Sequence, residues 1–206
     1  LVKRDAEAAA RVIAEDKRID ALERDVDSMT VRLLALRQPM AEDLRAIVVA
    51  LKISSDLERI GDYAKNIAKR ISTLTQTPPQ ESVHTLRRMA AIVQSMIKTV
   101  LDAYIERDLD RANDVIQRDE EVDTLHTSLF RELLTYMMED ASNITPCTHL
   151  LFVAKNIERS GDHATNIAEN VQFLVSGTSL TDDRPKGDES STVVVEPQTA
   201  EAKGTI

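Results

Sequence analysis

Four pairs of acidic residues spaced four apart could bind a cation, and they occupy matching places in the two halves of the sequence. The pairs are Asp16 and Asp20, Glu58 and Asp62, Asp119 and Asp123, and Glu158 and Asp162. Residues four apart lie on one face of a helix, about 40° from each other, so each pair brings two carboxylates together. Like charges at this spacing destabilise an isolated helix. The four recurrences therefore call for a compensating positive charge.

Two sources of that charge are open. Charged helix faces usually remain in solvent, where nearby side chains such as Lys52, Lys65, Lys69 and Arg59 would neutralise the acids. Alternatively, neighbouring antiparallel helices place two acidic pairs together, and a metal ion offsets their repulsion. Iron, zinc, manganese, magnesium and calcium all accept carboxylate oxygens. On this second interpretation all eight residues are candidate metal ligands, of unknown metal identity.

The sequence contains no motif typical of a catalytic site or of a nucleotide-binding loop. The Glu-x-x-His pairs of di-metal oxidases are missing, and His84, His126, His149 and His163 fit no such spacing. The sequence also has no nucleophile grouping of the Ser/His/Asp or Cys/His kind and no Gly-rich phosphate loop. We expect neither catalytic residues nor an organic cofactor.

The acidic pairs belong to an internal repeat. Residues 56–71, DLERIGDYAKNIAKRI, return as residues 156–171, NIERSGDHATNIAENV, with eight of the sixteen positions identical. A second block, near residues 9–22, returns 103 residues later at residues 112–125. On a helix, Glu58 and Asp62 lie opposite the apolar stripe, so we expect these carboxylates to point away from the packed face. We interpret Gly61 and Gly161 as points of close helix packing.

The composition predicts an all-α protein. Aromatic residues are 3% of the 206, Trp is missing, and there are only 5 Gly and 6 Pro, whereas helix-forming residues abound. Apolar periodicity and breakers such as Pro39 predict helices at about residues 5–37, 41–74, 82–106, 108–139 and 145–176.

These helices divide into two units. We expect a first repeat at residues 1–76, a linker at 77–81, a second repeat at 82–177, and a polar, disordered tail at 178–206. The second repeat has three helices, whereas the first has only the equivalents of the last two. We therefore expect tandem three-helix bundles, with the first helix of the first bundle missing from this chain. Its apolar row Leu22, Val26, Met29 and Leu33 would then be open to a partner, which predicts a homodimer.

Charge narrows the choice of partner. The formal net charge is −9, which argues against binding nucleic acid, because that needs a basic face. The longest apolar runs, residues 47–51 and 150–154, are too short to insert into a membrane. Cys147 is the one cysteine, and a charged start replaces a secretory leader, so we expect a cytoplasmic protein.

Two long segments resemble a known family. Residues 37–71, RQPMAEDLRAIVVALKISSDLERIGDYAKNIAKRI, and 149–171, HLLFVAKNIERSGDHATNIAENV, are similar to the two signature regions of the PhoU family of phosphate-transport regulators. The resemblance implies two pseudo-symmetric three-helix bundles and negative control of the phosphate regulon. It also implies contact with a sensor histidine kinase and with the ATPase of the phosphate ABC transporter. Family members share an acidic motif that holds metal clusters, and here it falls on the four pairs.

The expected function is thus that of a non-enzymatic regulator of phosphate uptake with metal-binding acidic motifs. Ser160, Asn156, the missing helix and the polar tail depart from the family pattern. Two alternatives stay open at this point. One is a carboxylate-bridged metalloenzyme, and the other is a helical scaffold that binds no metal.

Overall fold

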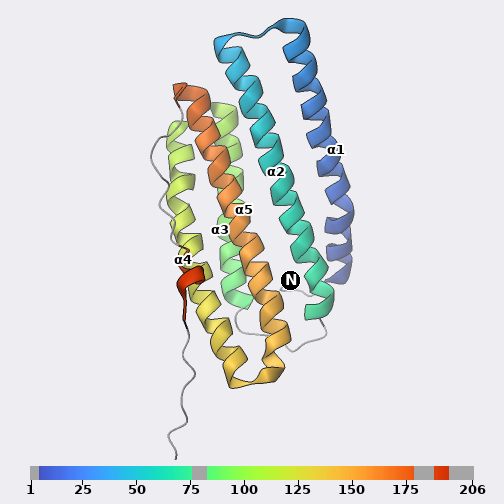
Figure 1. The fold of residues 1–206 in the computed structure, drawn as a ribbon, viewed down its shortest axis with the longest axis vertical. Coiled ribbons are helices and arrows are strands. Elements are labelled where there is room, and N and C mark those ends of the chain that lie inside the picture. Colours follow the sequence, from blue (N-terminus) through green and yellow to red (C-terminus); the bar gives the residue numbers. More distant parts are fainter. Residues whose placement is uncertain (1–4, 76–82, 179–187, 195–206) are drawn as a thin grey trace, which may run out of the picture.

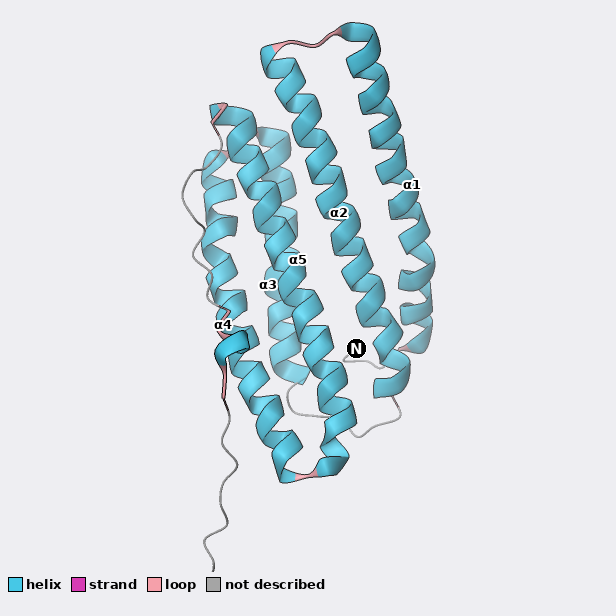
Figure 2. Ribbon diagram, viewed as in Figure 1, coloured by secondary structure: helices cyan, strands magenta, loops and turns pink. Residues whose placement is uncertain are grey.

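The protein consists of long antiparallel helices (Figures 1 and 2). The computed structural model describes residues 5–75, 83–178 and 188–194. The α-helices are α1 (Ala6–Arg37), α2 (Ala41–Leu74), α3 (Val83–Glu106), α4 (Leu109–Glu139) and α5 (Ile144–Ser176), and two 3₁₀ turns are η1 (Ala141–Asn143) and η2 (Ser190–Thr192). The described residues contain no strand. The all-α prediction and its five helices are confirmed, whereas the predicted linker at 77–81 lies outside the described residues.

Local signals explain where these helices begin and end. Asp5 and Asp108, which are equivalent under the 103-residue offset, cap α1 and α4 by accepting hydrogen bonds from the amides of Ala8 and Arg111. Helix α1 ends where Gln38, before Pro39, adopts the left-handed conformation with φ of 45°. Gly177, with φ of 76°, ends α5 in the same way and needs no strained side chain.

The helices form a pair and a bundle. Helices α3, α4 and α5 pack against one another, α1 packs along α2, and α2 packs along α5, which joins the two halves (Figure 1). Among the described elements, α1 contacts no helix other than α2. The second half therefore has the three helices expected of it, and the described part of the first half has two.

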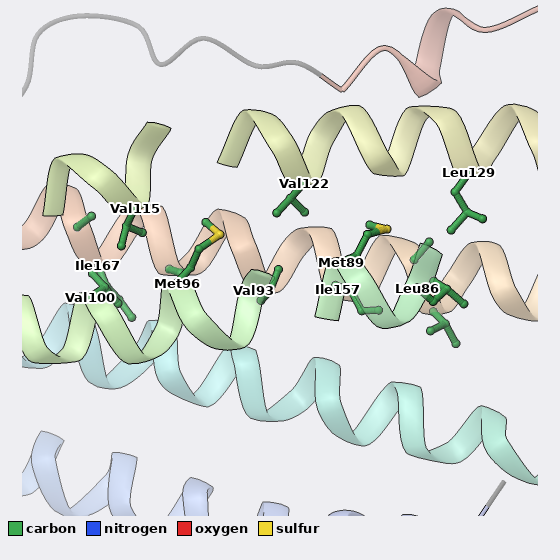
Figure 3. Packing of buried hydrophobic residues seen from close by; sticks show 14 of the residues in the cluster. Leu86, Met89, Val93, Met96, Val100, Val115, Val122, Leu129, Ile157 and Ile167 are labelled. Atoms are coloured by element: carbon green, nitrogen blue, oxygen red, sulfur yellow. The ribbon is translucent and has the colours of Figure 1, made fainter. Parts of the chain in front are cut away.

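The main core lies inside the three-helix bundle and extends toward α2 (Figure 3). Its largest buried side chains include Leu86, Met89, Met96, Leu129 and Ile167. Helix α5 is central, because 15 of its 33 residues are buried. By contrast, the separate core between α1 and α2 is small, consisting of Ala9, Ala68, Ile71 and the partly buried Ile13.

The repeated glycines sit where helices approach closely. A Cβ on Gly61 would lie 2.9 Å from Cδ1 of Ile19, on α1. A Cβ on Gly161 would lie 3.2 Å from Oδ1 of Asp119, on α4, and 3.6 Å from Cγ2 of Val93, on α3. These positions support the interpretation of both glycines as packing points, and they bring α5 against the acidic residues of α4.

Candidate functional site at the repeated acidic pairs

In the first repeat, a lysine lies between the acidic pairs of α1 and α2. Lys65 Nζ is 2.7 Å from Asp16 Oδ2 and 2.6 Å from Asp62 Oδ1. The hydrogen bond to Asp16, followed by the one to Asp62, raises the pKa of Lys65 above its ordinary value. Asp16 is itself buried. The ammonium group therefore supplies positive charge at the point where the two helices bring their carboxylates together.

Glu58 lies beside this ion pair, on α2. Burial, and then the charge of Asp62, raise the pKa of Glu58, with smaller contributions from Asp20 and Glu23, while Arg59 opposes them. Arg59 is only loosely placed, with nitrogens 3.8 Å from Glu58 Oε2 and 3.9 Å from Asp62 Oδ2. The acids of the first repeat thus lie near one another, and Lys65 contacts two of them, Asp16 and Asp62.

The second repeat buries its acids more deeply. Asp119, Asp123 and Glu158 are each at most 5% exposed. Lys155 Nζ is 2.8 Å from Glu158 Oε1, but Glu158 Oε2 is buried without a hydrogen-bond partner. Burial raises the pKa of Glu158 above its ordinary value, although Lys155 lowers it. Asp162 is half-buried.

Glu58 and Asp62, which we expected to point away from the packed face, are partly buried, and several of the other repeated acids are more enclosed. Asp16, Asp119, Asp123 and Glu158 are all buried. Helix α5 packs against α2, α3 and α4. Gly161, three residues after Glu158, approaches Asp119 on α4, so α4 lies near the side of α5 that carries Glu158. Periodicity within one helix identifies one packed face, and it does not reveal a second neighbour that covers the polar side.

The two repeats place their lysines differently. Lys65 is equivalent to Thr165, whose hydroxyl donates to the carbonyl oxygens of Gly161 and Asp162 at 3.1 and 2.8 Å. Lys155 is equivalent to Ser55. One repeat therefore has its lysine one turn after the acidic pair, and the other has it one turn before.

A segment of the predicted tail also reaches the second repeat. Asp188 Oδ2 is 2.8 Å from Lys155 Nζ, and Asp188 Oδ1 is 3.3 Å from Nδ1 of His126, on α4. The amide of Glu189 donates to Thr127 Oγ1 at 3.2 Å. Burial raises the pKa of Asp188, but the hydrogen bonds from Lys155 and Ser190 outweigh it and hold the pKa well below its usual range.

Burial also lowers the pKa of His126, although the charge of Asp188 opposes this effect. Of the predicted tail, residues 188–194 make these contacts with α4 and α5, whereas residues 179–187 and 195–206 lie outside the described part of the chain. No periodicity or motif in the sequence links Asp188 to His126 and Lys155, so sequence reasoning missed this contact.

The acidic residues fit a hard cation only in part. Within residues 5–75, 83–178 and 188–194, no three His, Cys, Asp or Glu side chains are grouped to hold a metal ion. Lys65 already bridges the acids of the first repeat. The second repeat fits better, because Glu158 Oε2 is buried without a hydrogen-bond partner. Lys155 contacts the other oxygen of this carboxylate, Oε1.

These features define a class: an all-helical protein built from a repeat, with acidic loci at the helix contacts of each half. The PhoU domain family matches residues 1–71 and 86–171. The chain belongs to the PhoU family, whose members are accessory and regulatory proteins of phosphate-specific transport systems and not enzymes. None of the described helices is long and apolar enough to span a bilayer.

Relatives and solved structures agree with this assignment. The chain is 54% identical over 189 residues to the "Phosphate-specific transport system accessory protein PhoU homolog" of Caulobacter vibrioides, covering 91% of this chain and 82% of the relative. The homolog of Rhizobium meliloti is 48% identical over 194 residues, with 94% and 82% covered.

Two crystal structures share the fold. PhoU from Pseudomonas aeruginosa has a TM-score of 0.84 and 41% identity, covering 86% of each chain. The phosphate transport system regulatory protein PhoU from Streptococcus pneumoniae has a TM-score of 0.81 and 30% identity, covering 87% of this chain and 84% of its own.

Replacing Lys65 with Met should lower the free energy of unfolding by roughly 1–3 kcal/mol, because the buried Asp16 loses a charged hydrogen-bond partner. The folded-state pKa of Lys65 is raised, so its contribution is complete below the pKa of an unfolded lysine, about 10.4, and is lost as the pH rises through the folded value. Urea unfolding at pH 7 and at stepwise higher pH measures both effects.

Lys98→Met is the matched control for this prediction. Lys98 also pairs with an aspartate, Asp102, at 2.8 Å, but its side chain is 80% exposed. Its loss should cost less than about 0.5 kcal/mol. Equal effects of the two substitutions would show that Lys65 contributes no more than a surface ion pair.

Proposed function

We propose that this protein regulates phosphate uptake and is a negative regulator of the phosphate regulon. In this proposal it acts in the cytoplasm by contact with a sensor histidine kinase and with the ATPase of the phosphate ABC transporter. The observation that carries the proposal is membership of the PhoU family, at 54% identity to a phosphate-specific transport system accessory protein. Membership of the PhoU family indicates that the protein acts in phosphate-specific transport. The identity of its partners is a further proposal.

The repeat supports a mechanism by contact. Two related halves present two related surfaces, so one molecule can engage two partners, each weakly. The first contact then raises the effective concentration for the second. The net charge of −9 favours basic surfaces on the partners and makes the rate of docking sensitive to salt.

We also propose that the acidic pairs bind metal ions. The acids of the second repeat are the better candidate for this site. Asp119, Asp123, Glu158 and Asp162 would hold the ion there. The support is chemical: buried carboxylates need positive charge, and one oxygen of Glu158 lacks a partner. A bound cation would crosslink α4 and α5. A scaffold that binds no metal is the contrary outcome.

A third proposal is a homodimer formed through α1. Leu22, Met29 and Leu33 are 57%, 64% and 43% exposed on this helix. Val12 is 40% exposed, whereas its repeat equivalent on α4, Val115, is fully buried in the three-helix bundle. A second copy would cover on α1 the surface that the bundle covers on α4.

Deletion of the gene should make phosphate-regulon expression constitutive in phosphate-rich medium, because the contact that represses the kinase is lost. A reporter fused to a regulon promoter measures this, with the intact gene restored as the control. The purified protein should bind the kinase or the ATPase less tightly as salt rises. Unchanged expression and phosphate uptake after deletion would refute the regulatory proposal.

Asp119→Asn with Asp123→Asn should weaken binding of Mn²⁺ or Mg²⁺ at least tenfold, because two carboxylate ligands lose their charge. Equilibrium dialysis of the chain, purified without chelator or affinity tag, measures this. Asp110→Asn with Asp114→Asn is the matched control, since these acids are also four apart on α4 but exposed. No cation binding, or equal losses in both variants, would favour the metal-free scaffold.

Leu22→Glu with Met29→Glu should convert a dimer into a monomer, because two charges would be buried in the contact. Light scattering over a range of concentrations measures the mass. Glu substitutions at Val194, which is also exposed but lies away from α1, provide the control. A wild-type chain that stays monomeric at high concentration would contradict the dimer.

A further inference from the structure

A basic groove lies between α2 and α5, away from the acidic residues of the repeats. It has a volume of about 510 Å³. One face of each helix lines it, at helical spacings: Asn66, Lys69, Arg70 and Thr73 from α2, and His149, Phe152, Asn156 and Arg159 from α5. Because these residues lie on facing stripes of two packed helices, the groove is part of the rigid contact between the halves.

The groove concentrates positive charge in an acidic protein. Lys69, Arg70 and Arg159 line it, whereas the whole chain carries a net charge of −9. Among the described residues, neither Arg70 nor Arg159 has a carboxylate within ion-pair distance. By contrast, Lys65 on α2 and Lys155 on α5 each contact two carboxylates.

Arg70 is held in place at the centre of the groove. Its Cζ lies 4.1 Å from the ring centroid of Phe152, a cation–π contact. Its Nη1 lies 3.3 Å from His149 Nδ1, within hydrogen-bonding distance. The Nε of Arg70 is buried without a hydrogen-bond partner. A preorganised guanidinium with unused donors is suited to an oxyanion.

The repeat supplies an internal comparison. A second groove on α2 and α5, lined by Lys52, Ser55, Asp56, Asn166, Glu169, Asn170 and Phe173, is its counterpart under the 100-residue offset. In the second groove Glu169 and Asn170 replace Lys69 and Arg70. Both grooves keep one cation–π contact, and in the second Lys52 lies 5.9 Å from the ring centroid of Phe173. The shape of the groove therefore follows from the repeat. The excess of positive charge does not, because Asp56 and Glu169 accompany Lys52 in the second groove, whereas no acid among the described residues lines the first.

We propose that the basic groove is a binding site for a phosphate group, either inorganic phosphate or the phosphate of a nucleotide. Arg70 and Arg159 would offer planar pairs of donors to two oxygens, and Lys69 would add a point charge. Phe152 is 50% exposed, and its ring would give a nucleoside an apolar surface to contact. This site is independent of the acidic pairs and does not rest on the proposed regulatory partners.

Calorimetric titration of the full chain with phosphate and with AMP, both without divalent cation, tests the site. Arg159→Gln should weaken binding about tenfold or more, because one charged hydrogen-bond donor is lost. Lys52→Gln is the matched control: it removes the same charge from the counterpart groove and should leave the affinity unchanged. Tighter binding of AMP than of phosphate identifies a nucleotide site, and equal binding identifies the free anion.

A second measurement keeps the test valid if a variant folds poorly. In the wild-type chain, the NMR signal of the Arg70 Nε–H group should shift on titration with the ligand, whereas signals from the counterpart groove should not. No binding of either ligand at millimolar concentration would overturn the proposal. Binding that Arg159→Gln leaves intact, or that Lys52→Gln weakens equally, would overturn it too.

Discussion

The packing of α2 along α5 is the constraint on which the rest of the structure depends, because it is the contact that joins the two halves. At its centre, repeat-equivalent positions 63 and 163 meet. Tyr63 Oη is 3.3 Å from His163 Nε2, and His163 Nδ1 is 2.8 Å from Asp56 Oδ1. Since α5 also packs against α3 and α4, 15 of its 33 residues are buried. A polar side chain that is buried on α5, such as that of Thr165, therefore needs a partner inside the protein.

This burial explains the chemistry of the acidic residues. A carboxylate that loses water needs either a cation or hydrogen bonds. The chain supplies lysines from its own helices, Lys65 in one half and Lys155 in the other, and Lys155 also holds Asp188. The acids are thus neither a solvated surface nor a set of free ligands. Any external cation must compete with an internal ammonium group.

The positions of the helices could be predicted from the sequence, but the contacts of each helix with its neighbours could not. Pro39, Asp5 and Asp108 act through local backbone geometry, so the helix bounds could be predicted to within a few residues. The repeat also identified Gly61 and Gly161 as close packing points. The burial of Glu158, however, depends on α4 covering the polar side of α5, which no local pattern records. The Lys155–Asp188 contact and the basic groove likewise join residues that are distant in the sequence.

The divergence of the repeats is as informative as their similarity. Identical repeats would present the same surface twice, and such a protein would bind one kind of partner at two places. Here the two halves keep the same helices, but equivalent positions differ in charge. Position 65 is Lys and its equivalent 165 is Thr, and position 69 is Lys and its equivalent 169 is Glu. At position 69 and its equivalent 169, which lie outside the core, such a substitution changes charge without moving the buried residues. Divergence of this kind gives two halves of one fold different electrostatic surfaces, and discrimination between two different partners requires such a difference.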